Sequence, residues 1–398
     1  MLNNDRPLPL LILLSYLFLS SFLQTAAAQA TPLHHVSAKQ CASCHQTIYQ
    51  QWQGSMHANS TALKDPIHGA FYKAVVGDPT QEGLTKQDKY PVCLQCHAPA
   101  AAKDGKTDLS ALAIYGEGVN CVACHTISAY KGTQKASGGL QLGTQAYEYS
   151  STSLQGPGNS KITADGKHPI YSNTANPAIF KSNAVCMGCH DQRKNANKVT
   201  LCQTGSEISA SETEGNCLDC HMKKVNGKAD HRFLGGHSSE MVSQGLAMSM
   251  THSESSNTLK VSIKLSNKLP HKLPTGAPFR NIYVKLTGYD KQGEIVWASS
   301  QSHPVKDDKK AMFMYSLGDA KGNPAPPPKA TQVLGDTRLK PYETRELNYA
   351  MAKATIVKLK AVAYYDLLLP AMKKKFPQAE HKDLVQPKVI AVSEIELN

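Results

Sequence analysis

The sequence lacks any long apolar run beyond its first two dozen residues. The one run that exists, Leu10–Leu23, is shorter than the ~20 residues that a membrane-spanning helix needs, and no later segment is long and apolar enough to span. This run follows a start that contains Arg6 and precedes Ala28-Gln29-Ala30, which fits the small-x-small pattern of a cleavage site. We therefore expect residues 1–30 to be a secretory signal peptide, with an uncleaved membrane anchor as the alternative. The mature chain would begin at Thr31 and be exported to the periplasm, the cell surface or the medium.

Cysteine is absent from both ends of the sequence. None lies near the predicted cleavage site, which excludes a lipid anchor there, and none follows Cys220. Residues 31–255 hold every cysteine and most histidines, whereas residues 256–398 alternate apolar and polar residues as a β protein does. We therefore expect two domains after the signal peptide, with their boundary in the polar run Thr251–Asn257.

Ten of the eleven cysteines belong to five copies of one pentapeptide, Cys-x-x-Cys-His. In the c-type haem attachment signature both thiols bond the porphyrin vinyl groups and the histidine ligates iron. A single Cys-x-x-Cys is also typical of a zinc half-site or a redox dithiol, but neither explains an adjacent histidine in all five copies. The sequence therefore predicts five covalently attached haem c groups. The attachment residues would be Cys41, Cys44, Cys93, Cys96, Cys121, Cys124, Cys186, Cys189, Cys217 and Cys220, and the iron ligands His45, His97, His125, His190 and His221.

The formal net charge of +12 would ordinarily indicate an anionic partner such as nucleic acid. Five haems bring ten propionate groups, however, which would offset most of this charge. The lysine excess is better explained as propionate compensation, so we expect no nucleic-acid partner.

The cysteine-containing region is small for its predicted cofactors. Roughly 225 residues would surround five haems, about 45 for each, so the porphyrins must themselves form much of the core, with short helices and long loops around them. The intervals between one motif's histidine and the next motif's first cysteine are 47, 23, 60 and 26 residues. We expect the second and third haems, and the fourth and fifth, to be close neighbours, with the first haem set apart in sequence.

The second axial ligand of each iron decides between electron transfer and chemistry, because two protein ligands leave no position for a substrate. Eleven histidines lie outside the motifs. His57 follows the first motif too closely to reach the opposite face of the same iron, so we expect it to serve another haem, with Met56 as its competitor. The other candidates inside the haem region are His168, His231, His237 and His68. His34 and His35 lie close to the expected N-terminus of the mature chain, on what could be an arm. His303 and His381 belong to the β region and are not expected to be ligands. Cys202, the odd cysteine, is expected to be a free thiol.

The C-terminal region contains seven strand-like runs separated by turn residues. They are Leu259–Leu265, Arg280–Tyr289, Glu294–Ser299, Met312–Leu317, Arg345–Met351, Thr355–Tyr365 and Val389–Leu397. Seven short strands in about 140 residues favour a β-sandwich of immunoglobulin type, and Leu367–Leu384 could add a helix. The predicted fold class is thus multi-domain, a mostly α and irregular multihaem domain followed by an all-β sandwich.

The run from Cys41 to His57, with Trp52 and Ser55 between, resembles the start of the multihaem cytochrome c family that includes the tetrahaem electron acceptor of hydroxylamine oxidoreductase. The resemblance covers most of Lys39–Gly236, through His168, Cys202, Cys220-His221-Met222 and His231-Arg232-Phe233. It implies electron transfer through closely packed haems, most of them held by two histidines, although one member of the family has a haem with an open position.

A second resemblance concerns Pro270-His271-Lys272-Leu273-Pro274-Thr275-Gly276, followed by Arg280. It is similar to the segment that opens the β-domain of exported multihaem cytochromes, except that Pro270 replaces the usual glycine. The resemblance implies that His271 projects from the domain junction towards a haem as an iron ligand.

Three functions remain open from the sequence. The first is an exported pentahaem electron carrier that works with unknown redox partner proteins. The second is a haem reductase or oxidase of a small nitrogen or sulfur compound, which would need one five-coordinate iron. No motif ends in lysine in place of histidine, and no catalytic constellation appears, so an electron carrier is expected rather than an enzyme. The third is a subunit of an extracellular conductive filament, with His34 or His35 as a ligand across the subunit boundary.

Overall fold

The computed structural model describes residues 31–158, 168–211, 215–353, 355–376 and 380–397. The predicted signal peptide, residues 1–30, lies outside the described residues. The chain from Leu33 onward forms one compact unit. Within the described residues, no helix has the length and apolar character needed to cross a membrane.

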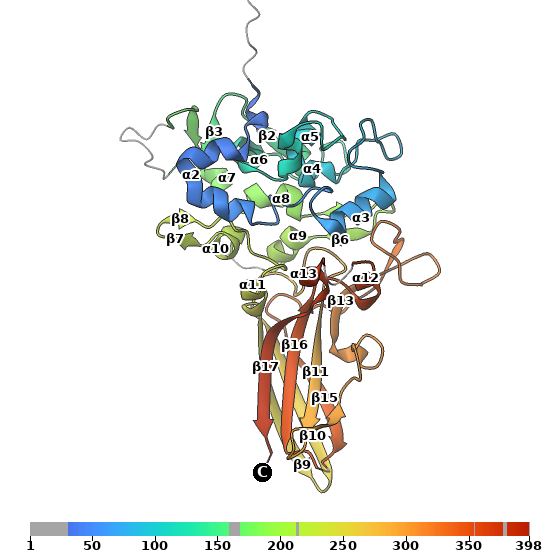
Figure 1. Ribbon diagram of the computed structural model, residues 1–398. Helices are drawn as coiled ribbons and strands as arrows, with labels where there is room; N and C mark the ends of the chain where they lie inside the picture. Colours follow the sequence, from blue (N-terminus) through green and yellow to red (C-terminus); the bar gives the residue numbers. More distant parts are fainter. Residues whose placement is uncertain (1–30, 159–167, 212–214, 354, 377–379, 398) are drawn as a thin grey trace, which may run out of the picture. The chain divides into compact units, whose positions relative to one another are not determined.

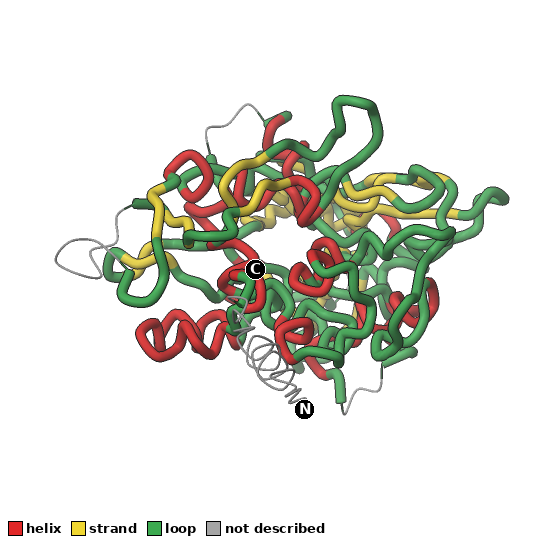
Figure 2. Tube along the Cα trace, turned by 90° about the horizontal axis from the view of Figure 1, so that it is seen from above, coloured by secondary structure: helices red, strands yellow, loops and turns green. Residues whose placement is uncertain are grey.

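Short helices joined by long loops make up the N-terminal region, as Figures 1 and 2 show. Among the described residues, two helices exceed two turns, and each has a side-chain cap: Ser37 accepts a hydrogen bond at the start of the first, and Asp65 at the start of the second. The helices are η1 (Leu33–His35), α2 (Ala38–Gln53), α3 (Pro66–Val75), α4 (Leu94–His97), α5 (Pro99–Lys103), η2 (Ala113–Glu117), α6 (Cys121–His125), η3 (Gly143–Ala146), α7 (Pro177–Phe180), α8 (Ala184–His190), α9 (Thr204–Ser209), α10 (Cys217–His221) and α11 (Ser239–Ser243).

Four two-stranded ribbons lie between these helices. They pair β1 (Ile127–Tyr130) with β2 (Tyr147–Tyr149), β3 (Leu154–Gly156) with β4 (Asn173–Ala175), β5 (Arg193–Lys194) with β6 (Thr200–Cys202), and β7 (Lys224–Val225) with β8 (Lys228–Ala229). Buried apolar side chains here form several small clusters, one around Tyr72 and Leu94, one around Tyr147 and one around Trp52. This distribution fits a region whose core is completed by something other than side chains.

The C-terminal region is built from two antiparallel sheets. The first has the strand order β15 (Thr344–Ala352), β10 (Thr258–Asn267), β9 (Leu246–Ser255). The second has the order β14 (Gln332–Asp336), β13 (Met312–Gly318), β11 (Asn281–Tyr289), β16 (Lys358–Asp366), β17 (Lys388–Glu396), and β12 (Ile295–Ala298) also pairs with β11. Buried residues alternate along both β10 and β16, and they belong to one apolar cluster that both sheets share.

The strands agree with the seven expected runs, and two further strands are present. β9 starts at Leu246, so the expected domain boundary falls at the hairpin turn between β9 and β10 and not before the first strand. β14 was not expected, since its residues are mostly exposed and show no alternation. Of the helix expected over Leu367–Leu384, the structure shows two single turns, α12 (Pro370–Lys373) and α13 (Lys382–Val385), because the prolines of this stretch prevent one continuous helix.

Candidate haem sites

The five Cys-x-x-Cys-His motifs share one local structure. Each lies on a helical turn, in α2, α4, α6, α8 and α10, and the last four of these helices end at the motif histidine. Positions i, i+3 and i+4 fall on one face of a helix, so both thiols and the imidazole of each motif are presented together. In α2 the backbone departs from helical geometry at His45 itself, with φ −118° and ψ 42°. Asn120 and Asn216 cap α6 and α10 with their side chains.

The motifs approach one another in pairs that differ from their order in the chain. The thiol of Cys41 lies near that of Cys121, so the first motif neighbours the third. A second thiol pair, Cys96 with Cys189, joins the second motif to the fourth. The fourth and fifth motifs meet through Cys186 and Cys217, as expected from their short separation. The first motif is therefore set apart only in sequence.

The motif histidines are oriented by backbone carbonyl groups. The Nδ1 atoms of His97, His125 and His221 are hydrogen-bonded to the carbonyl oxygens of Ser60, Gln155 and Leu234, at 2.9, 2.7 and 2.6 Å. A ring that donates from Nδ1 carries its free lone pair on Nε2, which is the arrangement that a metal-binding histidine needs.

Burial keeps several of these rings neutral. Desolvation lowers the pKa of His57 and of His97 to about 3, and that of His190 to about 4, and neighbouring imidazoles lower them further. A neutral imidazole is the form that binds a metal ion, so at neutral pH these side chains are ready to act as ligands.

Three histidines from outside the motifs lie opposite a motif histidine. The ring centres of His45 and His168 are 6.1 Å apart, those of His57 and His190 6.1 Å, and those of His125 and His231 6.4 Å. Two imidazole nitrogens bound at about 2 Å on opposite sides of one metal ion place the ring centres roughly 6 Å apart. All three separations match this spacing. His57 thus lies with the fourth motif, away from the first motif that precedes it in the chain.

Two of these three partners differ in their hydrogen bonds. His231 donates from Nδ1 to the carbonyl oxygen of Ala229 at 2.8 Å, as the motif histidines do. His168 instead accepts at Nδ1 from the backbone N–H groups of Ile170 and Tyr171, at 3.2 and 3.0 Å. Its Nδ1 is therefore occupied as an acceptor, so His168 is held towards His45 by a different backbone contact.

His68 and the second motif have a tighter geometry. The rings of His68 and His97 are only 4.1 Å apart, and both Nδ1 atoms are directed at the carbonyl oxygen of Ser60 at 2.9 Å. The Nε2 atom of His68 is buried and has no hydrogen-bond partner. The same is true of the Nδ1 atom of His57. A buried ring nitrogen without a partner is costly unless it binds something else, which is what an iron ligand does.

His271 comes from the β region and reaches the fifth motif. Its Nδ1 is hydrogen-bonded to the carbonyl oxygen of Lys272 at 2.9 Å. Burial lowers the pKa of His271 to about 4, and the nearby imidazole of His221 lowers it further. His271 therefore lies within electrostatic range of His221.

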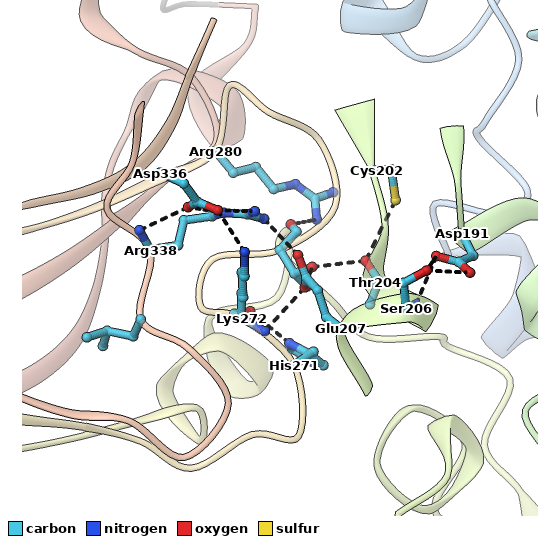
Figure 3. Close-up of polar contacts among 12 residues, drawn as sticks. Asp191, Cys202, Thr204, Ser206, Glu207, His271, Lys272, Arg280, Asp336 and Arg338 are labelled. Atoms are coloured by element: carbon cyan, nitrogen blue, oxygen red, sulfur yellow. Dashed lines mark hydrogen bonds and ion pairs between the residues drawn. The ribbon is translucent and has the colours of Figure 1, made fainter. Parts of the chain in front are cut away.

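A buried carboxylate holds the loop that carries His271 (Figure 3). Glu207, on α9, accepts hydrogen bonds from the hydroxyl of Thr275 at 2.6 Å and from the backbone N–H of Lys272 at 3.2 Å. Its other oxygen pairs with the guanidinium of Arg338 at 3.0 Å, and Arg338 also pairs with Asp336 at 2.8 Å. Sequence reasoning missed Glu207, because a single glutamate in an irregular region carries no motif signal.

The remaining sequence candidates have other surroundings. Burial and the positive charges of Arg280 and Lys388 lower the pKa of His237 to about 4, and within the described residues no ring contact joins it to a motif histidine. The thiol of Cys202 contacts the carbonyl oxygen of His190 at 3.7 Å and the Thr204 hydroxyl at 3.7 Å, and burial raises its pKa.

Four further histidines lie away from the motif pairs. His303 packs on Tyr283, with ring centres 4.3 Å apart, and His381 precedes α13. His34 and His35 both contact Asp104 of the same chain.

The residues present fit haem c. Each motif supplies two thiols and one imidazole on a single helical face, and buried ring nitrogens without partners lie beside the second and fourth motifs. The neighbouring thiols described above also bring the motifs together in pairs.

Comparisons with known proteins agree with this reading. Residues 40–126 match the family model described as cytochrome c554 and c-prime. Among solved structures, a penta-heme cytochrome c552 from Thermochromatium tepidum is 45% identical, with a TM-score of 0.86, over 92% of this chain and 100% of that chain. A β-glucosidase from Kluyveromyces marxianus also matches, at 9% identity and a TM-score of 0.14 over 38% of this chain and 14% of that chain, which supports no argument. A search of curated proteins finds no match.

Proposed function

This chain belongs to the pentahaem c-type cytochromes and carries five covalent haem c groups, and on this basis we propose that it is an exported electron carrier whose irons are mostly closed by two histidines. Each haem iron supplies a one-electron couple when bound. The observation that carries the proposal is the set of three histidine pairs with ring centres 6.1 to 6.4 Å apart.

The proposed second ligands are assigned by these contacts. His168 serves the first motif, His231 the third and His57 the fourth. His68 is assigned to the second motif through its unpartnered Nε2, and His271 to the fifth through its proximity to His221. These five account for all five irons, which leaves His237 without a role as a ligand.

The chain's own residues have three tasks in this function. The backbone carbonyls that accept from Nδ1 orient the imidazoles and fix which nitrogen faces the metal. Desolvation lowers the pKa of His97 and of His190, so that each stays a neutral ligand at neutral pH. The thiol contacts between the first and third, second and fourth, and fourth and fifth motifs place neighbouring attachment sites close enough for electrons to pass between them.

We assign the C-terminal region to the immunoglobulin-like sandwiches. Labelled A, B, C, E, F and G in chain order, β9, β10 and β15 give the sheet A-B-E, and β11, β16 and β17 give the sheet C-F-G. This is the distribution of strands that immunoglobulin-type domains show. The proposed sandwich begins at Leu246, the first residue of β9, ten residues before the boundary at 255/256 that the sequence predicts, and the proposed haem domain precedes it from residue 31, after a signal peptide at residues 1–30.

Spectroscopy of the purified holoprotein tests the proposal. We expect low-spin ferric signals to dominate the EPR spectrum, and a reductive titration to take up five electrons per chain. Mass spectrometry of the exported chain should give five haems and a start at Thr31. A dominant high-spin signal that shifts on addition of cyanide or nitrite would contradict the electron-carrier proposal.

One observation favours a second candidate function, the reduction or oxidation of a small nitrogen or sulfur compound at the second haem. The 4.1 Å separation of His68 and His97 is about 2 Å shorter than the other pairs, and both rings approach Ser60 from Nδ1. If His68 stays in this position, the iron at His97 keeps an open side. A minor high-spin signal that is already present in the wild type and stays unchanged in a His68→Ala variant, together with steady turnover of hydroxylamine or nitrite, would support this function.

A further inference from the structure

Two histidines and one aspartate near the start of the unit Leu33–Asn398 converge on a single point. His34 and His35 lie in η1, and Asp104 follows α5. The Nε2 atom of His34 is 2.7 Å from Oδ1 of Asp104, and the Nε2 atom of His35 is 2.5 Å from Oδ2. The three ligand atoms, one from each residue, lie within 4.8 Å of one another.

This convergence is unusual for neighbouring residues. Side chains at positions i and i+1 of a helical turn normally point in different directions. Here the two rings are 4.4 Å apart in an edge-to-face arrangement, and both present Nε2 to the same carboxylate. The conformation of η1 therefore brings two imidazoles onto one carboxylate.

A second group orients the carboxylate. The hydroxyl of Tyr115, in η2, donates a hydrogen bond to Oδ2 of Asp104 at 2.7 Å. Outer hydrogen bonds of this kind fix the position of carboxylate ligands in metal sites. The nearest lysine in sequence, Lys103, does not compete for Asp104, since its ammonium group lies over the ring of Tyr149 at 3.3 Å.

We propose that His34, His35 and Asp104 form a binding site for one divalent transition-metal ion, with zinc as the best match. Two imidazole nitrogens and one carboxylate oxygen suit zinc and its neighbours in the first transition row, whereas magnesium and calcium prefer oxygen ligands alone. Three protein ligands leave at least one coordination position open to solvent or to an external ligand.

The site is accessible to a metal ion from solution. The side chains of both histidines are 25% exposed and that of Asp104 is 20% exposed, so the ion can enter without unfolding. None of the three residues is needed as an iron ligand, because the second ligands proposed above come from other histidines. The bound ion would fasten η1 to α5 close to α6, which carries the third motif and contacts η1.

Zinc binding by the pentahaem holoprotein tests this proposal. The protein is prepared without a histidine tag, treated with EDTA, and titrated with zinc chloride in a calorimeter. The zinc retained after gel filtration is measured against iron by mass spectrometry. We expect one zinc per five irons in the wild type, and an affinity at least tenfold weaker in the His35→Ala and Asp104→Asn variants.

Two further variants make the test specific. His252→Ala removes an exposed histidine from β9 and should leave zinc affinity unchanged. Tyr115→Phe keeps all three ligands and should weaken binding about tenfold, with an unchanged haem spectrum. If Asp104→Asn fails to fold, the zinc affinities of His35→Ala and His252→Ala are compared instead, and only the first should be weakened. Absence of retained zinc in the wild type, or equal affinity in all variants, would overturn the proposal and leave a hydrogen-bonded cluster only.

Discussion

Replacing Glu207 by glutamine should loosen the contact between α9 and the loop that carries His271. The Glu207 side chain is 4% exposed and that of Arg338 is 7% exposed, so their ion pair is almost fully removed from water. Glutamine has nearly the shape of glutamate but no charge, and it replaces one acceptor oxygen by a donor. Thr275 and the N–H of Lys272 already share one oxygen of Glu207, and Arg338 pairs with the other, so the new amide NH2 group must face donors on one of these two sides.

The magnitude follows from these contacts. Hydrogen bonds to a charged group contribute about 1.5–3 kcal/mol each, and leaving a buried partner of an ion pair without its counter-charge costs about 3–5 kcal/mol. Arg338 keeps Asp336 as a second counter-ion, which reduces the loss. We therefore expect Glu207→Gln to lower the free energy of unfolding by about 2–3 kcal/mol, and Glu207→Ala by about 3–5 kcal/mol.

Guanidinium unfolding of the holoprotein measures this effect. The matched control is Glu240→Gln, at a side chain that is 63% exposed and lies 3.8 Å from Arg232, where the change should stay within about 0.5 kcal/mol. EPR provides a second readout, since weaker support of His271 should produce a high-spin fraction from one haem. Identical unfolding midpoints for Glu207→Gln and Glu240→Gln would refute the reasoning.

Three further predictions concern separate parts of the chain. Gly188→Ala should destabilise the protein by about 1–3 kcal/mol in thermal melts, because a Cβ there would clash with the ring of Tyr147. The control is Gly235→Ala, where no atom lies within 4 Å of the added Cβ and the stability should hardly change. An equal loss of stability in both variants would refute the clash. Burial would raise the pKa of Asp336, but hydrogen bonds from its basic neighbours outweigh it and hold the pKa at about 2. This depressed pKa stabilises the fold above about pH 4, and the contribution, about 1–2 kcal/mol, is lost as the pH falls towards 2. The stability gap between wild type and Asp336→Asn should therefore close over that range, and a gap that does not depend on pH would contradict it. His231→Ala should convert one haem to high spin in the EPR spectrum, and an unchanged spectrum would show that this histidine is not a ligand.

The sequence was sufficient for the features that short-range patterns encode. A Cys-x-x-Cys-His motif defines its own helical turn, so the ten cysteines and five motif histidines could be identified without a structure. The alternation of buried residues in β10 and β16 likewise revealed strands, since one face of each packs against the other sheet. β9 was not predicted because only Leu246 and Met250 are buried along it, which leaves no alternating pattern in the sequence.

Pairings between distant residues could not be obtained in the same way. The sequence separation of Cys41 and Cys121 does not predict that they lie side by side, because the long segment between them is compatible with many relative positions of the two motifs. His231 and His237 are only six residues apart, yet of the two His231 lies opposite a motif histidine and His237 does not. Such choices depend on tertiary packing, which a single sequence does not display.

The loop that carries His271 has a consequence for how the chain can be divided. Its contacts with Glu207 tie a segment of the β region to the helix α9 that precedes the fifth motif. A fragment that stops before this loop would lack the imidazole proposed for the last iron and would expose a carboxylate that normally has three partners. The β region therefore cannot be removed without disturbing the haem region, because it supplies both the candidate ligand His271 and the donors that satisfy Glu207.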